Sequence, residues 1–524
     1  MYDSDSIRTV ADIPRVHARL RPGATAIVCD GRELSYAEFE RRTNQCAHAL
    51  IDAGAQPGDR VACLAKNTED FFVLWFGAVK ARVCLAPVNW RLAPPEIAFI
   101  LQDAGAKLLV CGQDFQGVVD MIVSDCPDLH RLIQFEAGHP RWPAFNDWIE
   151  SYPDTDPGLP QPPDDDDVLQ LYTSGTTGMP KGVQLTEANF EQVFGAAAEG
   201  QWADFDPAKA VLVAMPMFHV SGTNFGLLGL LQGCRNVMLR EITPPNLLQA
   251  LEAQQIAYAF LVPAVINLVL QTPGIETADL SRLERLFYGA SPIAEDVLLR
   301  AAERFNAAFT QLYGLTETTG LGAVLPAEDH DPRRGKLRAC GKPWVAAELR
   351  VVRPDNSVAE AGEVGEIQIR SKAVMKSYWN RPEATAEAID AEGWFYSGDA
   401  GYFDDDGYLY IHDRVKDMII SGGENVYPAE VENALFSHYA VADAAVIGVP
   451  DHRWGEVVKA VVVLRPGLHA STADLIAHCR TRIAGYKCPK SVDFVTALPR
   501  NPSGKVLRRE LRAPYWAGRD RRVG

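Results

Sequence analysis

The chain has 524 residues, of which 47% are hydrophobic and 23% are charged. This globular composition excludes a wholly disordered, a collagen-like or a small disulfide-stapled protein. At about 150 residues per domain, the length predicts about three to four structural units. The net charge of −17 argues against non-specific nucleic-acid binding, which needs a basic surface.

The charge is spread unevenly along the chain. Residues 416–524 contain 16 Lys and Arg against 11 Asp and Glu, a net charge of +5, whereas the preceding residues contain 35 against 57, a net charge of −22. A basic last fifth on an acidic body predicts a separate unit that meets an anion. The alternative is a solvated basic tail, which we favour for the last three arginines, Arg519, Arg521 and Arg522.

Strand-like and helix-like segments alternate over the first 312 residues. A hairpin is expected over 25–35, and Ser35 with Glu38 has capping-box spacing before a helix that ends near Gly54. Helices are also expected from Thr68 and Pro94. Strands are expected at 60–64, 83–88, 107–111, 168–172, 210–214, 237–240, 258–262, 285–288 and 308–312. This alternation predicts mostly parallel sheets covered by helices.

The pattern changes at about 335–412, where short strand-like runs lie between Gly and Asp turns. These runs, at 348–352, 365–369 and 408–411, predict a small β-barrel subdomain. Mixed α and β segments then return, with strands at 417–420, 444–447, 457–463 and 492–495 and helices from 428 and 472. The predicted fold class is α/β, with a large N-terminal domain over 1–414 and a small α+β C-terminal domain over 415–524.

Targeting and redox signals predict a cytoplasmic protein. The first ten residues are polar and acidic, unlike a signal peptide. The longest apolar stretch, 256–270, is interrupted by Pro263 and Asn267 and is too short to span a bilayer. The ten cysteines form no CxxC pair and lie mostly in apolar runs, so we interpret them as reduced core residues. The eleven histidines show no zinc-enzyme spacing.

One segment carries a strong chemical signal. Residues 172–182, YTSGTTGMPKG, come at the end of a predicted strand and combine three glycines and the four hydroxyl residues at 173, 174, 176 and 177 with Lys181. Such a loop exposes many N–H and O–H donors to phosphate oxygens. It is not a Walker A loop, because no Gly-Lys-Ser/Thr follows at the required distance. A plain linker would not explain the embedded Pro-Lys-Gly.

This segment resembles the signature phosphate loop of the adenylate-forming superfamily, which contains acyl-CoA synthetases, firefly-type luciferases and peptide-synthetase adenylation domains. Further family segments follow in the same order up to Lys505, so the resemblance covers nearly the whole chain, and it is strongest to bacterial fatty-acid–CoA ligases. It implies ATP as substrate and Mg²⁺ as cofactor. The residues implied to bind ATP or AMP in this loop are Thr173, Ser174, Gly175, Thr176, Thr177, Gly178 and Lys181.

Residues 215–222, MPMFHVSG, resemble the family segment at the acid-substrate pocket. The resemblance places His219 near the substrate carboxylate, although a lone histidine can also be purely structural. The residues implied to line the acyl pocket are Val220, Gly222, Thr223 and Gly226. Gly222, Gly226 and Gly229 would share one helix face. That face could leave space for an acyl chain, and close helix packing explains the same spacing equally well.

Two segments resemble the adenosine and metal site. In 288–292, YGASP, the residues Gly289, Ala290 and Ser291 are implied to contact adenine, with Gly289 allowing close approach of the backbone. In 311–317, QLYGLTE, the resemblance implies that Tyr313 stacks on adenine, Thr316 binds phosphate and Glu317 holds Mg²⁺. Thr176 is implied as a second metal residue. A carboxylate beside a hydroxyl suits a hard cation already bound to nucleotide phosphates.

The remaining segments resemble the ribose site, the hinge and the C-terminal loops. Asp399 is implied to bind the ribose hydroxyls, with Ser397 where the family commonly has Thr. Arg414 is implied to contact ribose or phosphate, and Lys416 falls on the hinge position, with Asp413 where Gly is frequent. The residues implied to line the pantetheine channel are Ser421, Gly422, Gly423 and Glu424. Lys505, after Ser-Gly, is implied to lie between the acyl carboxylate and the α-phosphate.

The resemblance implies a ligase that converts an acid to its acyl-adenylate and then to the CoA thioester. We expect a medium- or long-chain fatty acid as substrate, ATP and CoA as partners, and a mobile C-terminal domain that swings about Lys416. A homodimer is expected only at the level of the family. The alternatives are a short-chain, aryl or sulfur-containing acid, or transfer to a carrier protein. An amino-acid-activating domain would carry Asp where His219 lies. A luciferase-like oxygenase and a non-catalytic nucleotide-binding module are the remaining alternatives, and the latter would lack Lys505 or Glu317.

Overall fold

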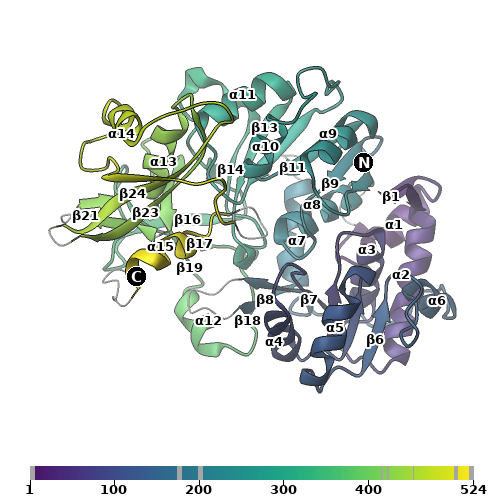
Figure 1. Cartoon of the computed structure of the whole chain (residues 1–524). Helices are drawn as coiled ribbons and strands as arrows, with labels where there is room; N and C mark the ends of the chain where they lie inside the picture. Colours follow the sequence, from purple (N-terminus) through teal and green to yellow (C-terminus); the bar gives the residue numbers. More distant parts are fainter. Residues whose placement is uncertain are drawn as a thin grey trace.

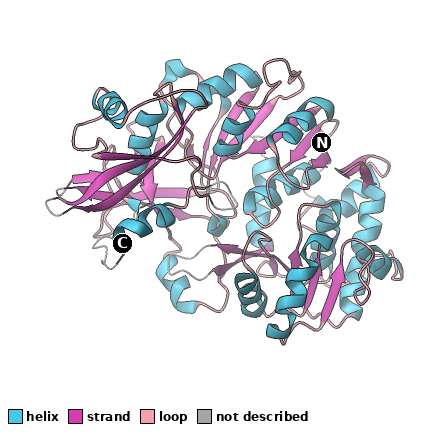
Figure 2. Ribbon diagram, viewed as in Figure 1, coloured by secondary structure: helices cyan, strands magenta, loops and turns pink. Residues whose placement is uncertain are grey.

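The computed structural model describes residues 6–173, 180–198, 204–414, 417–421, 424–451, 454–500 and 505–517. Among these residues the strands form four sheets, of which the two largest make up a helix-covered body and one a smaller C-terminal lobe beside it (Figures 1 and 2). The helices of the body are α1 (Asp12–Leu20), α2 (Tyr36–Asp52), α3 (Glu69–Lys80), α4 (Pro94–Ala104), α5 (Gln116–Ile122), α6 (Phe145–Glu150), α7 (Glu187–Ala198), α8 (Val220–Leu231), α9 (Pro244–Ala253), α10 (Pro263–Val269), α11 (Glu295–Phe305) and α12 (Pro382–Ala388).

The first large sheet has the strand order β15-β14-β13-β12-β11-β9-β10-β1-β2. Neighbouring strands from β13 to β1 are parallel, and the additions at both edges are antiparallel. Its strands are β1 (Thr25–Cys29), β2 (Arg32–Ser35), β9 (Ala210–Val213), β10 (Arg235–Met238), β11 (Ile256–Leu261), β12 (Arg285–Gly289), β13 (Ala308–Tyr313), β14 (Ala323–Leu325) and β15 (Lys342–Pro343). Parallel strands of this kind align their carboxyl ends along one edge of the sheet.

The second large sheet has the strand order β18-β8-β7-β4-β3-β5-β6. It is parallel from β7 to β6 and antiparallel where β8 and β18 are added. Its strands are β3 (Arg60–Leu64), β4 (Cys84–Pro87), β5 (Leu108–Cys111), β6 (Arg131–Gln134), β7 (Asp167–Thr173), β8 (Lys181–Thr186) and β18 (Ser377–Tyr378). The strand β18 lies almost 200 residues later in the chain than β8, with which it pairs, so this pairing joins two distant segments.

Helix α3 is the centre of the body, because all twelve of its residues are buried. Its aromatic side chains contact one another and reach α7, where the rings of Trp75 and Phe190 lie 5.8 Å apart. Full burial of one such side chain stabilises the fold by about 1.5–3 kcal/mol. The predicted cap of α2 is also present, because the Ser35 hydroxyl accepts a hydrogen bond from the Glu38 N–H at 3.2 Å.

The predicted β subdomain is a four-stranded antiparallel sheet with the order β16-β17-β19-β20. Its strands are β16 (Glu348–Val352), β17 (Gly365–Arg370), β19 (Phe395–Phe403) and β20 (Leu409–Arg414). The sheet is open rather than the predicted barrel. The short strands β15 and β18 of the same region join the two large sheets instead, and α12 interrupts the β pattern. An isolated bridge from Gly341 to Leu409 links the edge strand β20 to the first sheet.

The C-terminal lobe has its own sheet and its own apolar core. The elements of this lobe are β21 (Ile419–Ser421), β22 (Glu424–Val426), α13 (Pro428–Phe436), β23 (Val441–Asp451), β24 (Gly455–Leu464), α14 (Thr472–Arg480), β25 (Ser491–Phe494) and α15 (Arg508–Trp516). The lobe contacts the body at α10, where the Asn267 side-chain amide donates to the Ala442 carbonyl at 3.3 Å. The predicted boundary at 414/415 falls between β20 and β21.

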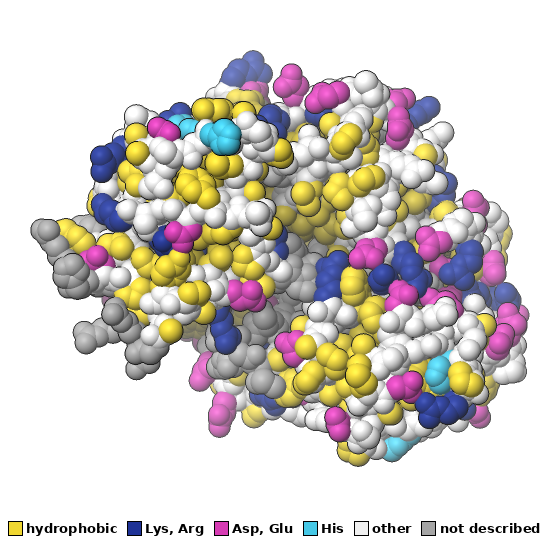
Figure 3. All heavy atoms as spheres, viewed as in Figure 1, with side chains coloured by type: hydrophobic (Ala, Val, Ile, Leu, Met, Phe, Trp, Pro, Cys, Tyr) yellow, Lys and Arg dark blue, Asp and Glu magenta, His cyan; other side chains and the backbone are white. Residues whose placement is uncertain are grey.

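The structure agrees with the α/β fold class and with the interpretation of the cysteines, all ten of which are free and buried. Within the described part of the chain, no helix combines the length and the apolar character needed to cross a membrane. Lys and Arg side chains are interspersed with Asp and Glu side chains on the face of the body shown in Figure 3.

Candidate active site

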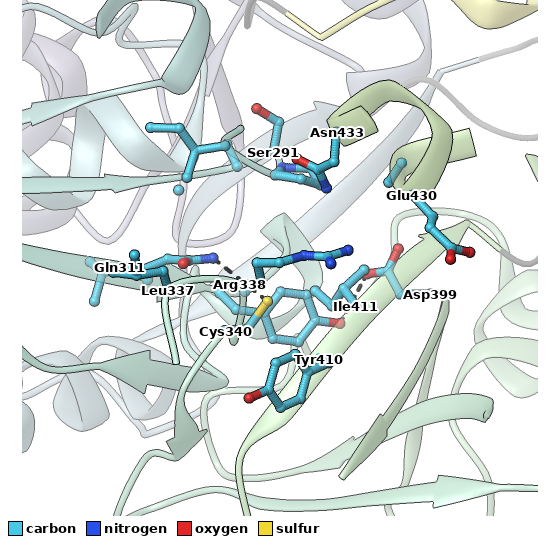
Figure 4. Close-up of a pocket in the computed structure, with 18 of the residues that line it drawn as sticks. Ser291, Gln311, Leu337, Arg338, Cys340, Asp399, Tyr410, Ile411, Glu430 and Asn433 are labelled. Atoms are coloured by element: carbon cyan, nitrogen blue, oxygen red, sulfur yellow. Dashed lines mark hydrogen bonds between the residues drawn. The ribbon is translucent and has the colours of Figure 1, made fainter. Parts of the chain in front are cut away.

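A cavity of about 530 Å³ lies where the body meets the C-terminal lobe. Its walls come from the carboxyl ends of β12 and β13, from β19 and β20 of the β subdomain, and from α13 and α15 of the lobe. Figure 4 shows Ser291 and Asn433 on one side of this space and Cys340 and Tyr410 on the other, with the Arg338 side chain extending between them. The cavity therefore lies at the sheet edge where ligands of parallel α/β folds bind.

Close backbone packing shapes the turn after β12. A Cβ atom on Gly289 would lie 2.2 Å from the Leu312 carbonyl oxygen, so only glycine fits there. The next residue, Ala290, has a φ of +66°, in the left-handed region that non-glycine residues rarely adopt. Both features bring the backbone of 289–291 to the cavity wall, where the sequence predicts contact with adenine.

A buried hydrogen-bond chain fixes the predicted adenosine residues. The Tyr313 hydroxyl donates to Asp399 Oδ2 at 2.9 Å, and both side chains are buried. The Asp399 N–H donates to Ser397 Oγ at 3.0 Å, and that hydroxyl donates to the Ile367 carbonyl at 2.6 Å. Serine thus supplies the hydroxyl that the more common threonine would supply. The arrangement holds the Asp399 carboxylate in one orientation at the cavity.

Glu317 lies in a short 3₁₀ turn, Thr316–Thr318, directly after the cavity residue Leu315. Its Oε1 accepts a hydrogen bond from the Tyr378 hydroxyl at 2.9 Å. The Lys181 ammonium lies 4.7 Å from the centre of the Tyr378 ring, a cation–π contact. One carboxylate suits a Mg²⁺ ion that arrives with nucleotide phosphates and keeps its waters, so Glu317 fits such an ion. The Lys181 ammonium would contact the phosphates rather than the ion.

His219 precedes the first turn of α8, and its side chain is half-buried with the Nε2 atom fully buried. Burial, and then the positive charge of Arg91, lower its pKa to about 4. Within the described part of the chain its Nε2 atom has no hydrogen-bond partner. Buried ring nitrogens are normally satisfied, so this atom is suited to a ligand that brings its own polar group.

The glycine face of α8 is filled by the protein itself. A Cβ on Gly222 would lie 2.3 Å from the Pro216 carbonyl oxygen, and one on Gly226 would lie 2.5 Å from the Phe72 ring. A Cβ on Gly229 would lie 2.0 Å from Asn236 Oδ1. Thr223 is also fully buried. Of the two explanations for the glycine spacing, the structure shows close packing, so this face provides no room for an acyl chain.

The C-terminal lobe contributes Lys505 and Arg508 to the cavity. Glu432 holds Arg508 through two contacts of 2.9 Å. Other basic side chains of the lobe are also paired, among them Lys487 with Glu430 at 2.8 Å and Arg512 with Asp417 at 2.8 Å. Much of the positive charge therefore serves to hold the lobe together, while Lys505 lines the cavity.

The structure brings together several residues that the sequence predicts from separate motifs. The predicted residues that line the cavity are Gly289, Ala290, Ser291, Tyr313, Asp399 and Lys505. Ser421 is buried in the lobe sheet, in β21, which Figure 1 shows at the end of the lobe away from the body. Predicted residues outside the described part of the chain are Ser174, Gly175, Thr176, Thr177, Gly178, Lys416, Gly422 and Gly423, together with the side chains of Arg414 and Glu424.

Some cavity residues were not predicted from the sequence. They are Leu337, Arg338, Cys340, Tyr402, Tyr410 and Asn433. Tyr402 and Tyr410 pair across β19 and β20, and their rings stack 5.0 Å apart. In the sequence, Tyr402 and Tyr410 lie on either side of a Gly- and Asp-rich turn, and this spacing could have predicted that they pair across two strands. No comparable signal marks Arg338 or Asn433, which only the tertiary structure brings to the cavity.

The described residues form a cavity between a large body of parallel sheets and a small lobe. Residues 15–379 match the family of AMP-binding enzymes, and residues 430–505 match the C-terminal domain of AMP-binding enzymes. The chain belongs to this family and is an acid–thiol ligase that works through an acyl-adenylate.

Relatives of this chain act on different acids. It is 39% identical over 519 residues to the fatty acid–[acyl-carrier-protein] ligase ScoC of Streptomyces coeruleorubidus, covering 99% of this chain and 98% of ScoC. It is 40% identical to a feruloyl-CoA synthase of Amycolatopsis sp., covering 96% and 98%. The structure of the anthranilate CoA ligase AuaEII in complex with anthranoyl-AMP matches with a TM-score of 0.90 at 26% identity, covering 98% and 99%.

Proposed function

We propose that the chain joins a carboxylic acid to coenzyme A in two half-reactions. In the first, the acid carboxylate attacks the α-phosphorus of ATP, which gives acyl-adenylate and pyrophosphate. In the second, the CoA thiolate attacks the acyl carbonyl and AMP leaves. The observation that carries the proposal is that Lys505 of the lobe lines the same cavity as Ser291, Tyr313 and Asp399 of the body.

The side chains divide the work of the first half-reaction. Two anions must meet, so fixed positive charge stabilises the transition state more than the separate substrates. Lys505 supplies this charge from the lobe, and Lys181 supplies it beside the phosphate loop. Tyr313 and Asp399 hold the adenosine. The neutral imidazole of His219 hydrogen-bonds the acid without adding charge.

Glu317 and Thr316 would hold Mg²⁺, with Thr176 as a further ligand from the phosphate loop. When bound, the ion neutralises charge on the phosphates.

The second half-reaction uses the loop at 421–424 in the same lobe, which lines the pantetheine channel. We propose that the lobe swings about Lys416 between the two half-reactions. We propose that the enzyme works in the cytoplasm.

As the acid we propose a medium- or long-chain fatty acid, with support from the similarity to ScoC. A second candidate is an aryl acid. It is favoured by the Phe72 ring against Gly226, which takes up space beside α8, and by the similarity to a feruloyl-CoA synthase. Transfer to a carrier protein instead of CoA is the alternative acceptor, again with support from ScoC.

A pyrophosphate-release screen tests the acid and the acceptor together. Saturated acids from C2 to C18 and a set of aromatic acids are each assayed with CoA, with a pantetheine-loaded carrier protein and with neither. We expect the highest kcat/KM at a medium or long chain, and sustained turnover only with CoA. A maximum on aromatic acids would replace the fatty acid by the aryl candidate. Turnover with the carrier protein but not with CoA would overturn the proposed acceptor.

A further inference from the structure

Tyr378 joins two parts of the site that are far apart in the sequence. It belongs to β18, which pairs antiparallel with β8 so that Tyr378 lies opposite Val183 and Ser377 lies opposite Gln184. This register places its ring 4.7 Å from the Lys181 ammonium, at the start of β8. Its hydroxyl donates a hydrogen bond to Glu317 Oε1 at 2.9 Å.

The segment around Tyr378 holds the Glu317 turn at two points. The Met375 N–H donates to the Glu317 carbonyl at 2.7 Å, so the backbone of the turn is fixed as well as its carboxylate. Tyr378 is itself fixed, because its N–H donates to Thr385 Oγ1 at 3.0 Å and its side chain is buried. The hydroxyl holds one carboxylate oxygen of Glu317, Oε1, in place. A carboxylate held in this way loses little freedom when it binds a cation.

We propose that Tyr378 is a positioning residue that orients Glu317 for the metal ion of the ATP–metal complex. The proposal rests on the proposed function, in which Glu317 holds that ion. Partners that hydrogen-bond a metal-binding side chain typically change metal affinity or activity about 10–100-fold when they are removed. Tyr378 thereby contacts both the Lys181 ammonium and the Glu317 carboxylate, the two charges that would flank the phosphates.

The variant Tyr378→Phe tests the hydroxyl alone, because the ring remains beside Lys181. Mn²⁺ is titrated in the presence of α,β-methylene-ATP and its bound fraction is read by electron paramagnetic resonance. We expect Mn²⁺ affinity to fall about 10-fold. The Mg²⁺ concentration for half-maximal adenylation should rise similarly, and excess Mg²⁺ should restore the rate, which it would not do for a merely unfolded fraction. Thiolation of supplied acyl-adenylate should not change.

Two controls separate this proposal from the proposed function. Tyr152→Phe removes another tyrosine–carboxylate hydrogen bond, the 2.6 Å contact with Asp52 outside the cavity, and should leave Mn²⁺ binding unchanged. Glu317→Gln tests the metal role itself. If Glu317→Gln weakens Mn²⁺ binding and Tyr378→Phe does not, the positioning role is overturned and the proposed function stands. If neither variant changes Mn²⁺ binding, the metal role of Glu317 fails and the positioning role fails with it.

Discussion

At the scale of single residues, the cavity depends on side chains that other side chains hold in place. Asp399 is oriented by the Tyr313 hydroxyl and by Ser397, and Glu317 is contacted by Tyr378. Motifs in the sequence predicted Tyr313, Asp399 and Glu317, because each lies in a short segment of family type. The partners Ile367 and Tyr378 were not predicted, because strand pairing brings them to the site from distant segments.

Tyr313→Phe should weaken ATP binding selectively. The variant keeps the ring but removes the hydroxyl that donates to the buried Asp399 carboxylate. Hydrogen bonds to charged groups contribute about 1.5–3 kcal/mol, so we expect the KM for ATP to rise about 10-fold or more. Steady-state kinetics with each substrate varied in turn measure this, with Tyr152→Phe as the matched control. An equal rise in the KM for the acid would show that the hydroxyl does not act through the nucleotide site.

Glu187, at the start of α7, gives the fold an unusual pH dependence. Burial raises the pKa of this carboxyl to about 8. The Val10 N–H, which donates to Oε2 at 3.1 Å, lowers the pKa; the nearby Asp12 and Asp166 raise it and Arg15 lowers it. Between the ordinary carboxyl value of 4.5 and about 8, the folded chain keeps a proton that the unfolded chain has released. The folded state binds more protons there, so this group's contribution to stability falls as pH rises through that window.

Glu187→Gln should therefore stabilise the protein more at pH 8.5 than at pH 5.5. The amide oxygen can still accept from Val10 but no longer titrates. Each unit of pKa difference corresponds to about 1.4 kcal/mol, so the Tm advantage of the variant should grow by about 3 °C or more across this range. Thermal melts at both pH values measure it. The exposed Glu191→Gln on the same helix is the matched control, and identical pH profiles for Glu187→Gln and the unmutated chain would contradict the expectation.

At the scale of elements, sequence patterns predicted long strands and capped helices well. The strands β3 and β16 begin and end at the predicted residues, and α4 begins at Pro94 as expected. Elements of two or three residues, such as β15, β18 and β22, were missed. So few residues carry no periodicity, and their pairing is decided by the strands that they meet. The predicted barrel was wrong because β16, β17, β19 and β20 form an open sheet, while β15 and β18 of the same region pair with the two large sheets.

Replacing a glycine by alanine should have opposite effects on stability at Gly226 in α8 and at Gly195 in α7. Gly226→Ala places a methyl group against the buried Phe72 ring, and overpacking of this kind destabilises by about 1–3 kcal/mol. Gly195→Ala, on α7, meets nothing within 4 Å, so it should stabilise by about 0.5–1 kcal/mol through helix propensity alone. Thermal melts should shift down and up respectively. If Gly226→Ala left the Tm unchanged and altered only the preferred chain length of the acid, the face would be open after all.

At the scale of the whole molecule, the body and the lobe line one cavity together. The chain is acidic before residue 416 and basic from there on. The structure gives one reason for this division, because Lys505 of the basic part lines the cavity. The order of the motifs predicted which segments would meet. It could not predict Asn433 or Arg508 in the cavity wall, because the placement of the lobe against the body decides their position.

Lys505→Ala should separate the two half-reactions. Loss of the ammonium removes charge that stabilises the first transition state, and we expect adenylation to fall by about 100-fold or more. Thiolation from supplied acyl-adenylate should be largely retained, because it relies on the region of Ser421. Rapid-quench assays of each half-reaction measure both. The neighbouring basic residue Arg509→Ala serves as the control for lost charge, and equal loss in both steps for Lys505→Ala would contradict the division.

The position of Ser421 has a consequence for the order in which substrates and products exchange. While Lys505 lines the cavity, the strand that carries Ser421 lies at the other end of the same lobe. One rigid lobe cannot present both regions to the acyl carbonyl at once. Pyrophosphate should therefore leave before the thiol acceptor can react. The kinetics should be of the ping-pong type, although no covalent bond to the protein forms, and the acyl-adenylate waits in the cavity as a tightly held intermediate.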